Sequence, residues 1–257
     1  LVGSEMCIRD SNRLIEPTSG EILVNEKDIL SLSQKELVQF RQNNMSMVFQ
    51  KFALFPHKTV LQNVGYGLAI QNIPINEWDE RAKKWISRVG LDGYDTYYPG
   101  QLSGGMQQRV GLARALATDA EILLMDEAFS ALDPLIRSEM QNILLDLQNE
   151  LHKTIIFITH DLDEALKIGD RIAILRDGSM VQDSDPQKII MKPADDYVSD
   201  FIKDINRARV IQAKSIMTPS KSKSSGATVK EDMVLEDILQ IMSDAPSKPV
   251  TIEDTKG

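Results

Sequence analysis

The sequence predicts an α/β fold that is organised around a parallel sheet. Two runs, residues 122–126 and 154–159, consist largely of aliphatic, aromatic and β-branched residues. Such runs are typical of buried parallel strands, and open α/β sheets bind ligands at the carboxyl ends of their strands. From Met106 to Ala117, apolar residues recur at helical spacing, which predicts a helix that enters the core along one face.

Composition fits an ordinary α/β protein. The 257 residues are 42% hydrophobic and 26% charged, which is enough to build a core. The net charge of -9 argues against non-specific binding to nucleic acid. No apolar run is long enough to span a bilayer, and Cys7, the only cysteine, belongs to no disulfide or metal pattern. A cytoplasmic location is therefore expected, with any membrane reached through a partner.

The chain before these runs predicts two further strands and a helix. Residues 21–24 and 45–49 are expected to form strands near the ligand-binding edge. Residues 77–89 are rich in charge and carry Trp78 and Trp85 about two helical turns apart. This spacing predicts a helix with both tryptophans in the core.

A serine and two glycines precede the predicted helix at 106–117. Ser103 is a natural N-cap, and Gly104 and Gly105 would let a ligand approach the first free amides of the helix. This arrangement suits an anion such as phosphate. The alternative is a plain turn that caps a core helix, and three residues alone do not decide between the two.

Polar side chains end both predicted parallel strands. Asp126 and Glu127 follow the first strand, where one carboxylate can hold Mg²⁺ and the other can orient a water molecule that attacks phosphate. His160 follows the second strand. Either feature taken alone could be purely structural, because acids and histidines often end strands.

The remaining chain predicts a long helix, a hairpin and a small C-terminal module. Pro134 is expected to begin the helix, because proline is favoured at the first helical position. Residues 171–175 and the turn at 177–178 predict a pair of closing strands. Residues 228–252 predict one β-α-β unit. The inward face of the long helix is expected to consist of Ile136, Met140, Ile143, Leu147 and Leu151.

Taken together, these segments resemble the ATP-binding subunit of an ABC transporter, with the family's motifs in the family's order. The matching residues are Gln50 for the Q-loop, 102–107 for the signature, 122–126 for Walker B, 130–133 for the D-loop and His160 for the switch histidine. The resemblance implies a P-loop NTPase-like (RecA-like) cassette over residues 12–205, with a helical subdomain at about 52–110.

The resemblance also implies the ligands and the roles of individual residues. The ligand would be ATP, with Mg²⁺ held by Gln50 and Asp126. Glu127 would polarise the attacking water, and His160 would contact the γ-phosphate. Two cassettes pair head to tail in this family, so the signature residues would act on ATP held by the other copy of a homodimer. The implied nucleotide-binding residues are Gln50, Ser103, Gly104, Gly105, Gln107, Asp126 and Asp133.

The resemblance narrows to importers of glycine betaine, proline and related quaternary amines. It rests on residues 12–20, 52–57, 60–64 and 129–137, and the C-terminal extension decides it. In such importers a transmembrane permease and an external binding protein select the solute. The cassette would then lie at the inner face of the plasma membrane. The apolar loop with Phe52 and Phe55 is expected either to form the groove for the permease's coupling helix or to pack inside the helical subdomain.

Three alternatives stay open beside this interpretation. A polar amino-acid importer shares parts of the same stretches. A soluble ABC protein of translation or DNA repair shares the signature and Walker B, but it would carry a second cassette or a long coiled coil. A non-catalytic regulatory module would explain a missing phosphate loop, although it would not need Glu127 and His160.

The sequence departs from the family at the phosphate loop. Gly-x-x-x-x-Gly-Lys-Ser/Thr is absent, and counting back from residue 12 puts Ser4 at the lysine position and Glu5 at the Mg²⁺-binding position. A carboxylate beside a triphosphate would repel it. We expect residues 1–11 to be a foreign or misassembled leader without the first strand, phosphate loop and first helix, and the chain to bind and hydrolyse ATP poorly.

The C-terminal residues 206–257 resemble the opening of a CBS domain, a module that this importer family appends to its ATPase. The β-α-β unit predicted here is shorter than a full α+β CBS domain. Residues 220–226, rich in Ser and Lys, are expected to be a linker or loop. Sensing of nucleotide or ionic strength is therefore not expected from this part alone.

Overall fold

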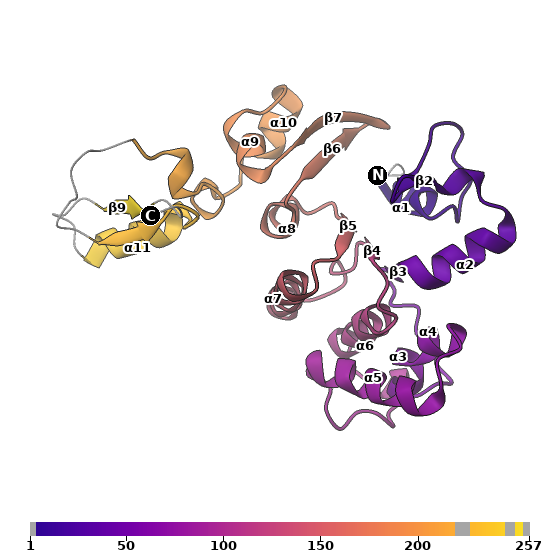
Figure 1. Cartoon of the computed structure of the whole chain (residues 1–257). Helices are drawn as coiled ribbons and strands as arrows, with labels where there is room; N and C mark the ends of the chain where they lie inside the picture. Colours follow the sequence, from indigo (N-terminus) through magenta and orange to yellow (C-terminus); the bar gives the residue numbers. More distant parts are fainter. Residues whose placement is uncertain (1–3, 219–226, 245–249, 254–257) are drawn as a thin grey trace. The chain divides into compact units, whose positions relative to one another are not determined.

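The computed structural model describes residues 4–218, 227–244 and 250–253. The chain divides into two compact units, residues 1–160 and 161–257, so the predicted cassette extends over both (Figure 1). Among the described helices, none is long and apolar enough to cross a membrane.

A three-stranded parallel sheet forms the centre of the first unit. Its order is β3 (Met45–Val48), β4 (Ile122–Asp126), β5 (Thr154–Ile158). Val48 pairs with Met125, which pairs in turn with Phe157, so the three strands end at the same edge. Every residue of β4 is buried, as its apolar sequence predicts. The three predicted strands are thus confirmed, while the strand expected at 21–24 is a short hairpin of β1 (Leu23–Val24) and β2 (Lys27–Asp28).

The expectation that residues 1–11 lack a first helix is wrong. Residues Ser4–Ser11 form α1, which lies against β4 and β5. Ile8 is fully buried and packs with Ile122 and Leu124 of the central strand. The physical reason is that one face of the sheet needs an apolar cover, and Ile8 supplies part of it. The side chains of Ser4 and Glu5 lie outside the described ones, so their predicted effect on a triphosphate stays a prediction.

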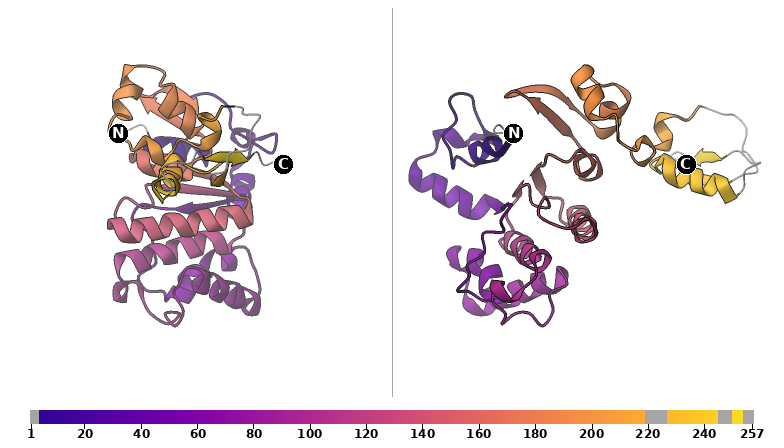
Figure 2. Two further views of the ribbon diagram at one scale, coloured as in Figure 1. Left: turned by 90° about the vertical axis from the view of Figure 1, so that its left-hand side faces the viewer. Right: turned by 180° about the vertical axis from the view of Figure 1, so that it is seen from behind.

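Four helices pack together as a helical layer in the first unit, at the bottom of Figure 1, and both views of Figure 2 show them side by side. Trp85 is 8% exposed, as predicted, whereas Trp78 is half-buried and covers Gly65, where an added Cβ would lie 2.2 Å from its ring. The four helices are α3 (Val60–Val64), α4 (Tyr66–Ile70), α5 (Ile75–Arg88) and α6 (Gly104–Ala117).

Helix α6 was expected to bury one face, but it is buried on nearly all sides from Gln108 to Ala117. It lies between α3 and α5 on one side and β3 on the other, and its small residues, such as Gly111 and Ala113, allow this close packing. The first unit also contains helix α2 (Gln34–Asn44) and two short 3₁₀ helices, η1 (Ile29–Ser31) and η2 (Pro99–Gln101).

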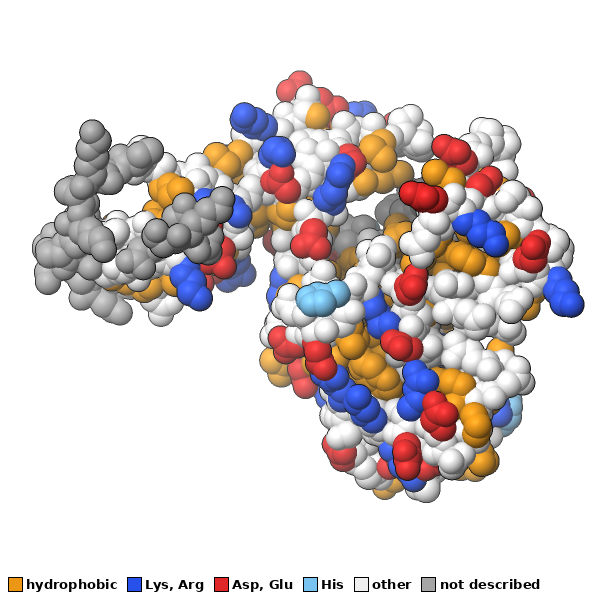
Figure 3. All heavy atoms as spheres, in the orientation of Figure 1, with side chains coloured by type: hydrophobic (Ala, Val, Ile, Leu, Met, Phe, Trp, Pro, Cys, Tyr) orange, Lys and Arg blue, Asp and Glu red, His pale blue; other side chains and the backbone are white. Residues whose placement is uncertain are grey.

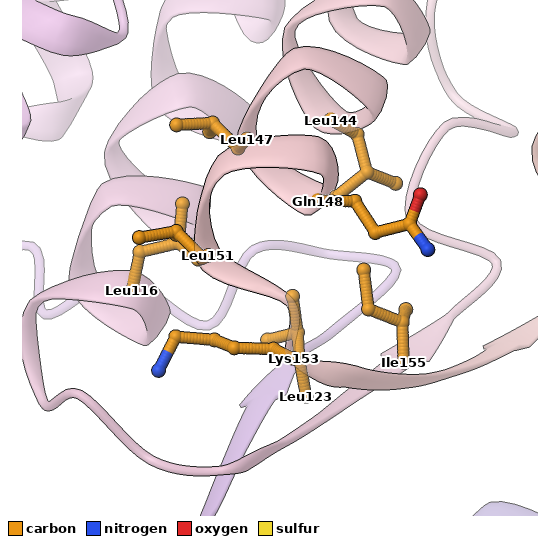
Figure 4. A pocket seen from close by; sticks show the side chains of 8 residues that line it. All are labelled: Leu116, Leu123, Leu144, Leu147, Gln148, Leu151, Lys153 and Ile155. Carbon is orange, nitrogen blue, oxygen red and sulfur yellow. The ribbon is translucent and has the colours of Figure 1, made fainter.

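Helix α7 (Pro134–Leu151) begins at the predicted proline, and Asp133 caps it. Met140 and Leu147 are buried as predicted, together with Leu144. Figure 4 shows leucines of α6, α7 and β4 meeting with Ile155 and the stem of Lys153 around a small cavity of about 10 Å³. The amine of Lys153 donates to the carbonyl oxygen of Ala120 at 2.7 Å, so only its stem lines the apolar space.

The second unit contains two separate apolar clusters. The first joins α8, the β6–β7 hairpin, α9 and α10, with Ile189 and Val198 fully buried. The hairpin confirms the closing strands predicted at 171–178. Its elements are α8 (Leu162–Ile168), β6 (Ile172–Arg176), β7 (Ser179–Ser184), α9 (Pro186–Met191) and α10 (Asp196–Phe201).

The second cluster forms the predicted β-α-β unit. Strands β8 and β9 are parallel, and Ile238 of the helix between them packs against Val229 and Ala213. The linker predicted at 220–226 lies outside the described residues. The elements of this part are η3 (Arg207–Arg209), η4 (Ala213–Ser215), β8 (Thr228–Lys230), α11 (Leu235–Asp244) and β9 (Thr251–Glu253).

Candidate functional site

The site is centred on Glu127, the first residue after β4. Its φ is +43°, a left-handed conformation that costs a non-glycine residue about 1–2 kcal/mol. The backbone is held there from two sides: its N–H donates to the carbonyl of Ile158 at 2.9 Å, and its carbonyl accepts from the Ser130 hydroxyl at 2.9 Å. Such strain is retained where surrounding contacts over-determine it, which is common at functional sites.

The carboxylate of Glu127 joins residues from the ends of all three parallel strands. The Nε2 of Gln50, after β3, donates to Oε2 at 2.7 Å. The Nδ1 of His160, after β5, lies 3.0 Å from Oε1. The Glu127 side chain is 13% exposed and that of His160 is 54% exposed, so the cluster is reached from solvent on the histidine side. The structure thus brings together three residues that the sequence singled out separately.

Asp126 and Asp133 flank this cluster in different settings. Asp126 is 5% exposed at the end of β4, where it pairs with Ile158 across the sheet. Asp133 lies at the surface, and its Oδ1 accepts from the N–H groups of Leu135 and Ile136, both at 3.2 Å. Asp133, predicted to contact nucleotide, therefore also caps α7.

The signature residues begin helix α6 and form no hydrogen bond with Gln50, Glu127 or His160 among the described residues. The Ser103 hydroxyl caps the helix, as predicted, by accepting from the N–H of Met106 at 3.3 Å. Gly104 is exposed and has open space around it, whereas a Cβ on Gly105 would lie 2.8 Å from Cγ2 of Ile136 in α7. Gly104 thus leaves room for a ligand, while Gly105 is required for helix packing. Gln107 donates to the carbonyl of Leu102 at 3.2 Å.

Two residues that the sequence analysis did not select also hold the site. Gln108, 1% exposed on α6, donates from its amide to the carbonyl of Ala128, next to Glu127. Arg114 donates to the carbonyls of Phe52 and Ala53, just after Gln50, and burial lowers the pKa of its guanidinium. The sequence offers little signal for these two residues, because α6 also carries Gln107 and Arg109 and no local pattern separates the four.

The oxygen donors near Glu127 fit part of a magnesium site. Carboxylates at Asp126 and Glu127, with an amide at Gln50, are the hard ligands that Mg²⁺ prefers. Within the described residues no group of three or more His, Cys, Asp or Glu is arranged to hold a metal ion. The fit is therefore to an ion bound mainly by phosphate and water, with one or two protein ligands.

A surface hollow lies beside the apolar loop that follows Gln50. Phe52, Leu54 and Phe55 are half-buried, and the rings of Phe55 and Tyr66 are 4.5 Å apart. The hollow has a volume of about 390 Å³ and lies over α3, α4 and the start of α5. Its walls include the rings of Tyr66 and Trp78. The ring of Phe55 thus packs against α4, and the groove for the permease's coupling helix stays a prediction.

Comparison with known proteins places these motifs in one family. Residues 11–130 match the family model described as ABC transporter. The chain is 57% identical over 215 residues to a glycine betaine/carnitine transport ATP-binding protein of Listeria monocytogenes. It is 54% identical over 215 residues to a glycine betaine transport ATP-binding protein of Bacillus subtilis. Each alignment covers 84% of this chain, and the chain spans only 54% and 51% of these relatives.

A third relative is covered more fully. The chain is 44% identical over 256 residues to a trimethylamine N-oxide transport system ATP-binding protein of Pelagibacter ubique, covering 99% of this chain and 75% of the relative. Among solved structures, a dimeric bacterial ABC transporter cassette is 32% identical with a TM-score of 0.66, over 72% of this chain and 81% of that one. A dimeric cassette in a post-hydrolysis state, bound to ADP and phosphate, gives a TM-score of 0.65 over the same shares.

Proposed function

Because this chain belongs to the family of ABC transporter ATP-binding proteins, we propose that it is the part of an importer ATPase that binds and positions ATP for hydrolysis. The observation that carries the proposal is the convergence of Gln50, Glu127 and His160 at the ends of three adjacent strands. A structural turn would not require a carboxylate held on both oxygens by an amide and an imidazole.

Each residue of the site has a defined task in this proposal. Glu127 orients and polarises the attacking water, and His160 contacts the γ-phosphate from the exposed side of the cluster. Asp126 and Gln50 would hold Mg²⁺, which neutralises phosphate charge when bound. Ser103, Gly104, Gly105 and Gln107 would cap ATP held by a second copy of the chain, because two cassettes pair head to tail in this family.

The proposed solute is glycine betaine or a related quaternary amine. This rests on relatives that are glycine betaine transport ATP-binding proteins at 57% and 54% identity. The trimethylamine N-oxide relative, covered over more of its length, keeps other methylated amines open as solutes. A polar amino-acid importer remains the alternative, because a permease and an external binding protein would select the solute.

The proposed partners are a second cassette and a transmembrane permease at the inner face of the membrane. Relatives of known structure are dimeric cassettes, which supports the pairing. The hollow beside Phe55, walled by Tyr66 and Trp78, is the surface that we propose for the permease. On the visible face of the helical layer, acidic and basic side chains are interspersed with apolar ones (Figure 3), so shape and apolar contact would govern docking there.

The C-terminal β-α-β unit is proposed to be part of a CBS module. The parallel pairing of β8 with β9 and the packing of Ile238 beneath them support this assignment. The proposal assigns no ligand to this unit.

The missing phosphate loop leads to a direct experiment. We expect the 257-residue chain to bind ATP weakly and to hydrolyse it hardly at all, because no lysine stands where the family's phosphate lysine would. ATP binding by calorimetry and phosphate release should be measured for this chain and for a version that carries Gly-x-x-x-x-Gly-Lys-Thr upstream of Asn12. Activity only in the second protein supports the importer ATPase.

The same measurement separates the second candidate function, a non-catalytic ABC-like regulatory module, which the absent loop favours. If the version with the loop folds and still neither binds nor hydrolyses ATP, the importer ATPase proposal is wrong. In that case the Glu127 cluster would have a role other than hydrolysis.

A further inference from the structure

Helix α6 carries two polar side chains that donate to backbone carbonyls close in sequence to Glu127 and to Gln50. Gln108 donates from Nε2 to the carbonyl of Ala128, and both residues are 1% exposed. Further along the helix, Arg114 donates from Nη2 to the carbonyl of Phe52 at 2.8 Å and from Nη1 to that of Ala53 at 2.7 Å. One helix therefore contacts the turn after Glu127 and the turn after Gln50.

The Gln108 contact fixes the direction in which the chain leaves the central strand. Ala128 directly follows Glu127, whose φ of +43° turns the backbone away from β4. A buried carbonyl that lost its donor would be left unsatisfied, so the Ala128 peptide is held firmly in one orientation. This carbonyl belongs to the peptide that joins Ala128 to Phe129, one peptide beyond Glu127, so its bond to Gln108 restrains the turn in which the Glu127 side chain begins.

The Arg114 contact fixes the turn after Gln50 in a similar way. Phe52 and Ala53 both have left-handed φ values, +59° and +46°, which two successive non-glycine residues adopt only when held. The fork of the guanidinium satisfies both carbonyls at once. Burial lowers the pKa of Arg114, in agreement with a cation that is bonded to backbone oxygens away from water.

We propose that Gln108 and Arg114 are positioning residues that set the 2.7 Å hydrogen bond between Gln50 and Glu127 from a single helix. Since α6 begins at Gly104, a displacement of its signature end would move both turns together. The consequence for hydrolysis rests on the proposed function. The hydrogen bond between Gln50 and Glu127 forms in the chain without nucleotide, so the role of Gln108 and Arg114 in setting it can be tested without measuring hydrolysis.

The test is the NMR spectrum of the 257-residue chain without nucleotide. The chain has only three histidines, so the imidazole signals of His160 can be followed with His57 and His152 as internal references. Gln108→Leu keeps the side-chain size and removes the donor. We expect the His160 imidazole and the Gln50 side-chain amide signals to shift or broaden, with His57 and His152 unchanged. Arg114→Met should move the Gln50 amide signal, and Arg114→Lys, which keeps a donor, should move it less.

The control is Gln71→Leu, which removes amide-to-carbonyl hydrogen bonds to Gln42 at 2.7 Å and to Thr118, at the far end of α6, at 3.3 Å. A folded Gln108→Leu protein with Gln50 and His160 signals identical to the parent would overturn the proposal, as would an equal shift in the control. If Gln108→Leu does not fold, Gln108→Met, which keeps the length of the side chain and also lacks the donor, is measured instead. Failure of ATP binding in the loop-bearing protein would remove the proposed function without changing these spectra.

Discussion

At the scale of single residues, Glu127 shows how a strained position is maintained. Its backbone lies in the left-handed region, its amide and carbonyl are both bonded, and its carboxylate has a partner on each oxygen. These partners come from β3, β5 and the turn that carries Ser130. No one contact determines the geometry, so the orientation of the carboxylate depends on the packing of the whole sheet edge.

The two signature glycines make a residue-scale prediction. Gly105→Ala would bring a methyl group within 2.8 Å of Ile136, whereas Gly104→Ala meets open space. We expect Gly105→Ala to lower the free energy of unfolding by about 1–3 kcal/mol, because overpacking displaces α6 from α7. Gly104→Ala should leave it nearly unchanged. Urea denaturation followed by circular dichroism measures both, and equal effects would show that Ile136 adjusts without cost.

At the scale of elements, the helical layer is fastened to α7 by two ion pairs. Arg88 of α5 pairs with Glu150, and Arg109 of α6 pairs with Glu139 at 2.6 Å. Arg109 also donates to the carbonyl of Val89, at the end of α5, at 3.3 Å. Arg109 therefore connects three helices, and its side chain is 16% exposed.

Arg109→Met makes the element-scale prediction. It keeps much of the apolar stem but removes the bonds to Val89 and Glu139, so we expect a loss of about 1–3 kcal/mol in the free energy of unfolding. Arg81→Met is the matched control, because Arg81 lies on α5 and has only an exposed partner, Glu77, at 3.9 Å. Denaturant midpoints of the two variants should differ clearly. Equal midpoints would contradict the connecting role of Arg109.

At the scale of the whole molecule, net charge and carboxylate pairing give a pH prediction. The chain has a net charge of -9 at pH 7. A hydrogen bond from Arg88 lowers the pKa of Glu150, and one from Arg13 lowers that of Glu16, below the ordinary value of 4.5. These carboxylates stabilise the fold at neutral pH. As pH falls below 4.5, the unfolded chain takes up protons first, so this stabilisation is lost.

We therefore expect the urea midpoint to fall between about pH 5 and pH 3. Arg88→Gln should make this fall shallower, because Glu150 then titrates near its ordinary value in both states. The contributions are small, since both carboxylates are at the surface. A midpoint that rises with acid, or an acid dependence that Arg88→Gln does not alter, would contradict the assignment.

The sequence by itself determined the three strands of the parallel sheet and the start of the long helix. Runs such as 122–126 are apolar throughout, and a buried parallel strand is the structure that suits them, so β4 followed from local pattern alone. Glu127 and His160 could be selected because each follows a predicted parallel strand, whereas Gln50 was selected only through the resemblance to the family's Q-loop. Asp126 was identified as the last residue of the segment that resembles the family's Walker B motif.

The tertiary structure determined the contacts between residues that are far apart in the sequence, which a local sequence pattern does not specify. Residues 4–11 contain few apolar side chains, yet α1 forms because Ile8 covers the sheet. Gly105 has a packing role because Ile136, far along the chain, comes within reach of it. Gln108 and Arg114 donate hydrogen bonds to the backbone carbonyls of Ala128, Phe52 and Ala53. Every residue has such a carbonyl, so the sequence does not indicate which ones these side chains bind. The sequence names the side chains, but only the fold determines which backbone groups they meet.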